Sequence, residues 1–282
     1  MDARVGAGLR RLARTAGLLA LTLVFITPYV WMVGSAFKPR AELFAHMTPL
    51  SWQTFVPLSP TLQNFTELFT QYQFARPLLN SLFVALGAMV LSTAINSQIA
   101  YVLAWIEFPG RELLFVAILA TLFVAFEAKL IPLYLITQRM GLHNTYLGLM
   151  VPWLADAYFI FLLRQHFREL SPELKEAALL DGCSYFRMYW NVMLPNIIPG
   201  LISAAFIKFI FTWDSYIWPV LVITDESMSV VTVALARLFS DEGVRWELLF
   251  AGSFVATVPV LIVFLFLQRY YVQGFLNSGI KG

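Results

Sequence analysis

Long intervals without a charged side chain constrain this sequence more than any other feature. Residues 15–37, 77–106 and 248–268 contain no Asp, Glu, Lys or Arg. A helix of roughly 20 apolar residues crosses the ~30 Å hydrocarbon core of a bilayer, so each interval is long enough to span it. Only 13% of all residues are charged, against about a quarter in soluble domains. The sequence therefore predicts an all-α, polytopic membrane protein.

Three further apolar intervals contain isolated charges. The third expected span reaches sufficient length only by continuing through Glu127 and Lys129, the fourth contains Asp156, and the fifth contains Lys208 and Asp214. The first span is too long for a signal-peptide core and is expected to be retained. We expect one transmembrane domain over residues 1–282, with six spans at about 15–37, 77–106, 113–135, 146–163, 197–223 and 248–268.

The distribution of Lys and Arg predicts the orientation. With the N-terminus inside, the inner loops and ends carry more Lys and Arg than the outer loops. Because cytoplasmic loops hold the excess of these residues, both termini and the segment 171–199 are expected in the cytoplasm.

The polar-rich segment 171–199 predicts two short helices joined by a tight turn. Ser171 can cap the first helix with its hydroxyl, and Gly182 lies where that helix would stop in a left-handed conformation. A second helix is expected over about 184–193, ended by Pro195.

Within this segment a long, position-specific pattern is formed by Glu176, Ala177, Ala178, Asp181, Gly182, Val192, Leu194 and Pro195. The pattern resembles the EAA loop of bacterial ABC-importer permeases of the maltose-type carbohydrate-uptake family. The resemblance extends to 160–165, to the pairs 213–214 and 218–219, and to the end at 279–282. Two departures are Cys183, where the family usually has Ala, and Asp214, where it usually has Asn.

The resemblance implies a transport subunit and not an enzyme. This chain would form half of the translocation pathway for a sugar or sugar-like solute, in a bacterial or archaeal cytoplasmic (inner) membrane. The implied partners are a second homologous permease chain, two copies of an ATPase subunit, an extracytoplasmic solute-binding protein and membrane lipid. ATP and Mg would bind the ATPase, so no cofactor is expected on this chain. The implied ATPase-coupling residues are Glu176, Ala177, Ala178, Asp181, Gly182, Leu194 and Pro195.

No catalytic, cofactor-binding or metal-binding motif is found in the sequence. It lacks the GxxxxGK[ST] phosphate-binding loop, so nucleotide-driven work must come from another polypeptide. His46, His143 and His166 are far apart, and Cys183 is the lone cysteine. A net charge of +2 without a basic run gives no indication of nucleic-acid binding.

The first helix of the EAA loop has two interpretations. Such a helix can lie on the bilayer surface, or it can dock into an ATPase. Its small face at Ala177 and Ala178 would anchor poorly in lipid, and the acidic Glu176 and Asp181 would be repelled by anionic lipid. These residues favour docking into a protein groove.

Ionisable residues within spans mark candidate functional sites, because an unpaired charge in the membrane is costly. We predict that the substrate pathway is lined by Asp156, Trp213, Asp214 and Trp218. Asp214 and Trp218 are four residues apart, so on one helix they would share a face and offer a solute a carboxylate beside an aromatic ring. Alternatively, Asp156 bonds a neighbouring helix and Trp218 anchors at the interface. Lys208 is expected to be structural, with its stem reaching cytoplasmic water.

The outer loop between the last two expected spans contains an apolar stretch, 229–239. Apolar side chains in water are unfavourable, so the stretch must pack on something. We predict that Val231, Leu235 and Leu238 contact the solute-binding protein; packing onto the chain's own spans is the alternative.

Two other functions remain open on the sequence alone. A proton-coupled secondary transporter could use Asp156, Lys208 and Asp214 as a relay, whereas a membrane enzyme would need a catalytic constellation that we do not find. The sequence does not name the sugar.

Overall fold

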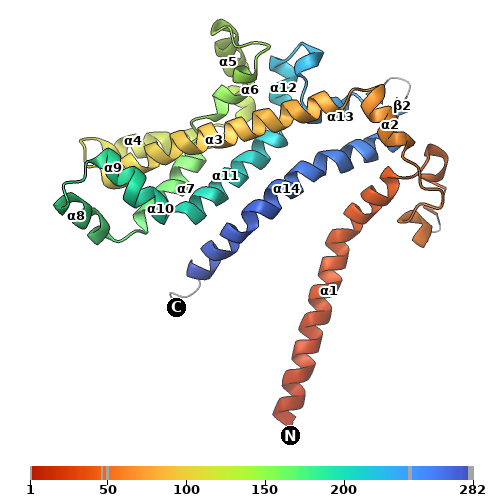
Figure 1. Cartoon of the computed structure of the whole chain (residues 1–282), viewed down its shortest axis with the longest axis horizontal. Helices are drawn as coiled ribbons and strands as arrows, with labels where there is room; N and C mark the ends of the chain where they lie inside the picture. Colours follow the sequence, from red (N-terminus) through yellow and green to blue (C-terminus); the bar gives the residue numbers. More distant parts are fainter. Residues whose placement is uncertain (1, 46, 49–50, 241–242, 279–282) are drawn as a thin grey trace. The chain divides into compact units, whose positions relative to one another are not determined.

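The computed structural model describes residues 2–45, 47–48, 51–240 and 243–278, and its elements are labelled in Figure 1. Within these residues the regular structure is helical apart from one short antiparallel pair of strands. The helices are α1 Asp2–Ala36, α2 Gln63–Thr70, α3 Ala75–Trp105, α4 Arg111–Ala120, α5 Phe126–Arg139, α6 Tyr146–Met150, α7 Ala157–Arg168, α8 Pro172–Leu180, α9 Tyr185–Met188, α10 Leu194–Asn196, α11 Ile198–Trp213, α12 Ile217–Val222, α13 Val231–Ala236 and α14 Trp246–Ser278; the strands are β1 Phe239–Ser240 and β2 Gly243–Val244.

Short non-α turns link several helices. Four of them matter for the site: the 3-10 turns η3 Thr121–Phe123, η4 Val151–Trp153 and η6 Glu226–Met228, and the π-helical turn η5 Tyr189–Met193. The others are η1 Arg40–Glu42 and η2 Trp52–Thr54. The chain divides into two compact units, Met1–Phe74 with Leu235–Thr257, and Ala75–Ala234 with Val258–Gly282. We call them unit 1 and unit 2.

Three helices of the described chain are long and apolar enough to cross a membrane. They are 11–36, 75–105 and 246–268, and they match the expected first, second and sixth spans. The other expected spans are not single straight helices. Residues 111–123 and 126–139 are bent by 104°, and 146–153 and 157–168 by 53°.

The expected fifth span is also interrupted, because α11 ends at Trp213 and α12 begins only at Ile217. Pro219 explains the position of the break. A proline cannot donate to the carbonyl four residues earlier and its ring clashes with it, which here is Ser215. The freed Ser215 oxygen instead accepts a hydrogen bond from Thr232 Oγ1, at 2.7 Å. The fifth expected span, 197–223, is therefore made of two helices, α11 and α12, with an interruption before Pro219.

Pro152 produces a similar break after α6. The carbonyl four residues before it belongs to Gly148, and this oxygen accepts from Trp218 Nε1 at 3.1 Å. Helix α7 then restarts with Asp156 as its N-cap, since the Asp156 carboxylate accepts from the backbone N–H of Tyr158 at 3.0 Å. The carbonyls freed by Pro152 and Pro219 are therefore both satisfied by side chains.

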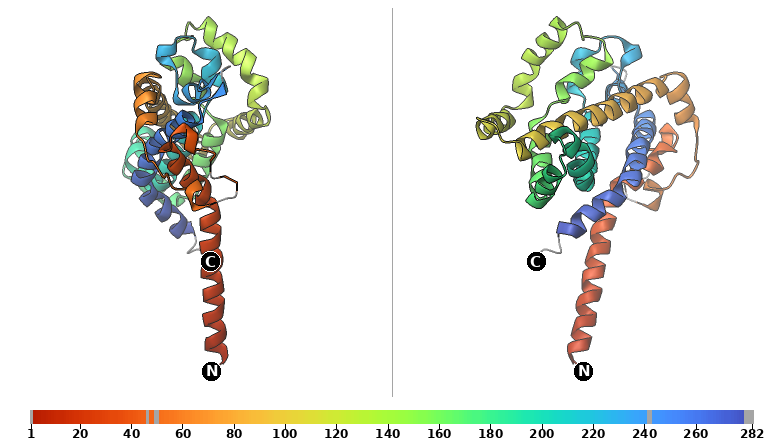
Figure 2. Two further views of the ribbon diagram at one scale, coloured as in Figure 1. Left: turned by 90° about the vertical axis from the view of Figure 1, so that its right-hand side faces the viewer. Right: turned by 60° about the vertical axis from the view of Figure 1, so that its left-hand side comes forward.

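Unit 2 is built on α3, which packs along α7 and α11. The two turned views show α3, in orange to yellow, running beside these helices (Figure 2). Polar side chains are buried within this packing, and Asn96, fully buried, donates from Nδ2 to Ser92 Oγ and to Leu154 O. The bond to Leu154 O ties α3 to the turn between α6 and α7.

Unit 1 is held together by an aromatic cluster and by buried polar groups. Phe37 lies 5.0 Å from Phe65 and 5.9 Å from Phe254, measured between ring centroids. The buried Lys38 donates from Nζ to the carbonyls of Gln53 and Thr54, at 2.8 Å each. The resemblance noted at 279–282, together with His46, lies outside the described residues.

Candidate functional site

The EAA loop, residues 171–199, forms the two predicted short helices. Ser171 caps α8, because its Oγ accepts from the backbone N–H of Glu173 at 3.3 Å. At the other end Gly182 adopts a φ of 70°. The N–H groups of Gly182 and Cys183 donate back to Leu179 O and Ala178 O, at 3.0 and 2.9 Å, which is the Schellman arrangement that satisfies the last carbonyls of a helix. The local prediction of this helix is confirmed at both ends.

The second half of the loop differs from the prediction. Residues 185–196 continue past Pro195 through η5 and α10, and an 83° bend separates them from α11. In a π-helical turn the hydrogen bonds run to the fifth residue back, so the chain accommodates Pro195 within the first residues of α10. The expectation that Pro195 ends the second helix is therefore wrong, and the chain turns at Ile197 instead.

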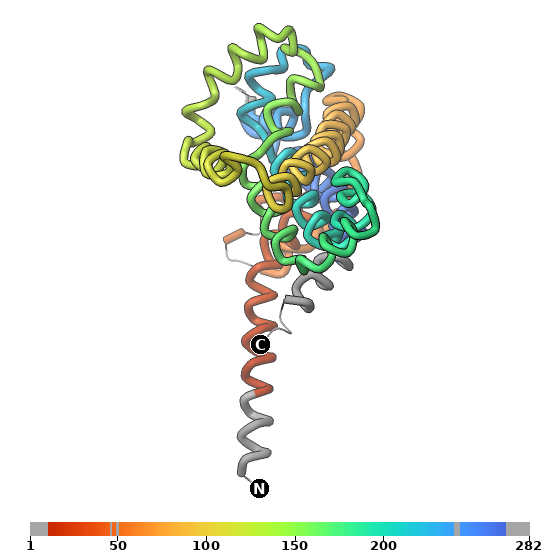
Figure 3. The backbone as a smooth tube through the Cα atoms, turned by 90° about the vertical axis from the view of Figure 1, so that its left-hand side faces the viewer, coloured from red at the N-terminus to blue at the C-terminus, as the bar shows by residue number. Residues whose placement is uncertain are grey.

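Hydrogen bonds fasten the loop to one end of α3. Tyr101 donates its hydroxyl to Tyr185 O at 3.0 Å, and Ser97 Oγ lies 2.7 Å from the hydroxyl of Tyr189. Lys175 donates from Nζ to Trp105 O at 3.1 Å, beside a cavity of about 400 Å³ that Glu176 also lines. The backbone trace follows the green loop past the yellow end of α3 (Figure 3). Because α8 and α9 are each bonded to α3, a displacement of the loop would be passed to that helix.

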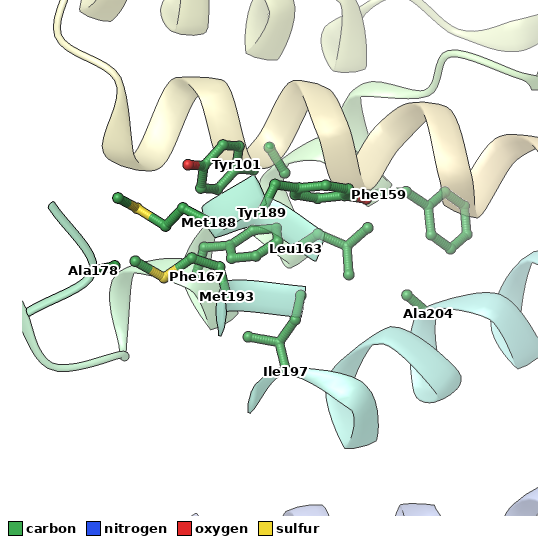
Figure 4. Close-up of a cluster of buried hydrophobic side chains, with 11 residues drawn as sticks. Tyr101, Phe159, Leu163, Phe167, Ala178, Met188, Tyr189, Met193, Ile197 and Ala204 are labelled. Atoms are coloured by element: carbon green, nitrogen blue, oxygen red, sulfur yellow. The ribbon is translucent and has the colours of Figure 1, made fainter. Parts of the chain in front are cut away.

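A buried cluster lies beneath the loop: Phe167, Met188, Tyr189 and Met193 belong to it, and Ala178 lies at its edge (Figure 4). Ala178 is 6% exposed. Its small side chain is therefore required by the packing of this chain itself. The small face was expected to dock into a groove of a partner, but Ala178 lies on the inner side of α8.

The outer side of the loop carries the remaining predicted coupling residues. Glu176, Ala177, Asp181, Gly182 and Pro195 are exposed, and Leu194 is partly buried. Two apolar residues that the sequence analysis did not single out are more prominent: the exposed fractions of Leu180 and Phe186 are 88% and 73%. Leu180 lies outside the helix face shared by Leu174, Ala177 and Ala178. This position in the sequence could have predicted that Leu180 is exposed.

Two of the charged residues within the expected spans, Lys208 and Asp156, form an ion pair that the sequence analysis did not predict. Lys208 Nζ on α11 lies 3.1 Å from Asp156 Oδ2 at the start of α7. Lys208 is 2% exposed and also lies 4.8 Å from the ring centroid of Phe159. A structural role for Lys208 agrees with this geometry, but the expectation that its stem reaches water is wrong, because Asp156 binds the ammonium inside unit 2.

The predicted carboxylate–aromatic site at Asp214 and Trp218 is not formed. The four-residue spacing assumed one helix, yet α11 ends before Asp214 and α12 begins after Tyr216. Asp214 is exposed, whereas Trp218 is 1% exposed and bonded to Gly148 O. Trp213 is buried and stacks on Phe209, with ring centroids 5.6 Å apart. Only Asp156, of the predicted pathway residues, lines a described cavity.

The apolar stretch of the outer loop packs largely within the chain. Val231, in unit 2, is fully buried, and its backbone N–H donates to Ser81 Oγ. In unit 1, Leu238 is buried and Leu235 lies against Gly252. These side chains follow the alternative interpretation, packing onto their own chain, while Phe239 next to them is exposed. Among the described residues, no group of His, Cys, Asp and Glu could hold a metal ion.

Comparison with known proteins places these features in context. Residues 111–277 match the family model described as "Binding-protein-dependent transport system inner membrane component". The chain is 33% identical to the probable ABC transporter permease protein YurM of Bacillus subtilis, over 94% of this chain and 87% of the relative. It is 30% identical to the arabinooligosaccharides transport system permease protein AraQ of Halalkalibacterium halodurans, over 95% of each chain. It is 33% identical to the diacetylchitobiose uptake system permease protein NgcG of Streptomyces coelicolor, over 93% of this chain and 86% of the relative.

The fold is also found in a solved structure. A bacterial ABC transporter involved in the import of the acidic polysaccharide alginate contains a chain that superimposes with a TM-score of 0.80, covering 92% of this chain and 95% of the other. At 20% sequence identity, this similarity establishes the architecture.

Proposed function

Because this chain belongs to the family of binding-protein-dependent transport system inner membrane components, we propose that it forms half of the translocation pathway for a sugar or sugar-like solute. It is a membrane subunit of an ABC importer and a transport component. Relatives that cover nearly the whole chain are named for oligosaccharide uptake, which supports a saccharide as the solute.

The exposure of Leu180 and Phe186 supports the proposed docking of an ATPase on the EAA loop. One side of the loop is bonded to α3 and packed on its own cluster, while these two apolar side chains remain uncovered on the other side. Large exposed apolar residues on a rigid element are typical anchors of a protein interface. We therefore place the main contact with the ATPase at Leu180 and Phe186, with Glu176 and Asp181 at its polar rim.

Docking of an ATPase on the EAA loop would also fix the orientation of the chain in the membrane. An ATPase works in the cytoplasm, so the EAA loop and both termini would lie on that side, in agreement with the excess of Lys and Arg there. ATP and Mg would bind the ATPase. On the opposite side a solute-binding protein would deliver the saccharide, and the exposed Phe239 is better placed to contact it than Val231 or Leu238.

The secondary-transporter alternative gains no support. The relatives are ABC importer permeases. Lys208 is held by Asp156, and α11, which carries Lys208, ends at Trp213, just before Asp214.

The first prediction tests transport. The chain, co-expressed with its partner subunits and reconstituted in liposomes, is expected to accumulate a radiolabelled saccharide, with arabinooligosaccharides and diacetylchitobiose, for which two relatives are named, as the solutes to test first. Uptake should fall to background when ATP is replaced by a non-hydrolysable analogue or when the binding protein is left out. Uptake by this chain alone, driven by a proton gradient, would contradict the proposal.

A second prediction concerns composition. The described chain has one EAA loop, which can hold one ATPase, whereas the family resemblance implies two ATPase copies in the importer. Native mass spectrometry of the gently solubilised importer is therefore expected to show this chain, a second homologous permease and two ATPase copies. An active complex with this chain as its only permease would refute the heteromeric arrangement.

A further inference from the structure

A small cavity lies where two broken helices of unit 2 meet. Its volume is about 230 Å³, and its lining comes from the break between α4 and α5 and from the break between α6 and α7. Non-helical backbone at membrane depth is tolerated where it is buried in protein or lines a water-filled cavity, and transporters bind solutes at such interruptions. The side chains relevant here are Phe126, Lys129, Trp153 and Asp156.

Asp156 is held in place at the wall of this cavity by three neighbouring residues. Its Oδ2 lies 3.1 Å from Lys208 Nζ, its Oδ1 accepts from the N–H of Tyr158 at 3.0 Å, and its own N–H donates to Asn96 Oδ1 at 3.0 Å. A carboxylate offers about four acceptor positions, and its side chain remains 26% exposed. The ion pair fixes the group while part of it stays open to the cavity.

An aromatic wall stands beside the carboxylate. Trp153 packs against Phe126, with ring centroids 4.9 Å apart. A sugar ring presents hydroxyl donors at its edge and apolar C–H groups on its face, so a carboxylate beside an aromatic ring matches both surfaces. The exposed Lys129 at the rim can donate to a ring or hydroxyl oxygen.

We propose that this cavity is a solute subsite that takes one sugar ring, with Asp156 accepting from its hydroxyls and Trp153 contacting its C–H face. Lys208 is a positioning residue that acts through Asp156. The proposal rests on the proposed function and assigns the aromatic contact to Trp153, in place of the buried Trp218.

Cysteine protection tests the subsite. In a Cys183→Ala background the complete importer would carry either Ala155→Cys, inside the cavity, or Val220→Cys, an exposed control on α12. The probe is the saccharide that the wild-type importer accumulates, and the label is N-ethylmaleimide. We expect the saccharide to slow labelling of Ala155→Cys by roughly fivefold or more and to leave Val220→Cys unchanged.

Substitutions in the same background separate binding from packing. Trp153→Leu is expected to abolish the protection, because a stacked aromatic ring contributes about a tenfold effect on affinity, whereas Trp153→Phe should retain most of it. Asp156→Asn combined with Lys208→Met should also abolish it without leaving an unpaired charge. Lys208→Met alone should weaken the protection of Ala155→Cys, whereas Lys208→Arg, which keeps the positive charge, should retain it. Both variants are expected to assemble with the ATPase.

The outcomes distinguish this subsite from the proposed function. Saccharide uptake by the wild type with no protection at Ala155→Cys, or with equal protection at Val220→Cys, overturns the subsite and leaves the function standing. Protection that survives Trp153→Leu overturns the role of the aromatic ring. A wild-type importer that accumulates no saccharide refutes the proposed function, and the subsite fails with it.

Discussion

An importer that carries Leu180→Asp together with Phe186→Asp is expected to lose uptake by roughly 30-fold or more. These side chains are 88% and 73% exposed at the outer side of the EAA loop. An interface anchor contributes about 2 kcal/mol or more, and two carboxylates in a desolvated contact would add an electrostatic penalty. Co-purification of the ATPase with this chain, together with uptake and ATP hydrolysis, measures the effect.

The chain offers a matched control for this variant. Leu62 is 66% exposed and is the N-cap of α2 in unit 1, where an aspartate is well tolerated. Leu62→Asp makes the same chemical change away from the loop and should retain the ATPase. If the double variant retains it equally well, the docking surface lies elsewhere on the chain.

Ala178→Trp would test a different property. Ala178 is 6% exposed and packs in the cluster beneath α8, so an indole there would overpack the core before any partner is involved. Loss of uptake in this variant would therefore report misfolding of the loop. The exposed pair lies outside this cluster, so its replacement removes the contact between Phe186 and Trp190, whose ring centroids are 6.4 Å apart, and leaves the cluster itself unchanged.

Local signals predicted the elements that local chemistry determines. Uncharged length predicted the helices at 11–36, 75–105 and 246–268. Ser171 and Gly182 predicted both ends of α8, since capping and left-handed backbone depend on a few neighbouring residues. The family resemblance at 176–195 added the functional class, which matches the family shown by comparison.

Contacts between distant residues were beyond a single sequence. Asp156 and Lys208 are 52 residues apart and meet because α7 and α11 pack on the same helix. Trp218 donates a hydrogen bond to the Gly148 carbonyl that Pro152 frees. This contact can be recognised only once the positions of α6 and α12 are known. The burial of Ala178 and the exposure of Leu180 likewise depend on which face of α8 meets unit 2.

Unit 1 contains an ion-pair network for which a large loss of stability is expected. Arg245 donates from Nη2 to Glu67 Oε1 at 2.7 Å and from Nε to Glu247 Oε1 at 2.6 Å. The hydrogen bond to Glu247, with a further contribution from Glu67, raises the pKa of Arg245 above its ordinary value, so the guanidinium remains charged throughout the physiological range. The network joins α2 to the start of α14.

Arg245→Met is expected to destabilise the importer by about 3 kcal/mol, because it leaves a buried carboxylate without its counterion. Glu247 is 3% exposed, and its Oε2 has no hydrogen-bond partner within the described residues. The expected fall in the apparent Tm of the solubilised complex is roughly 6–12 °C for a chain of this size. Thermal unfolding, followed together with proteolysis of the segment between α1 and α2, measures it.

Removing the carboxylates as well decides whether the uncompensated charge is the cause. In Arg245→Met combined with Glu67→Gln and Glu247→Gln, no ionised group is left buried without a counterion, so at least half of the lost Tm should return, as for buried pairs that are replaced as a unit. Glu67→Gln alone should cost less, because Glu247 still neutralises Arg245. A triple variant as unstable as Arg245→Met would mean that Arg245 stabilises unit 1 through packing of its side chain and not through its charge.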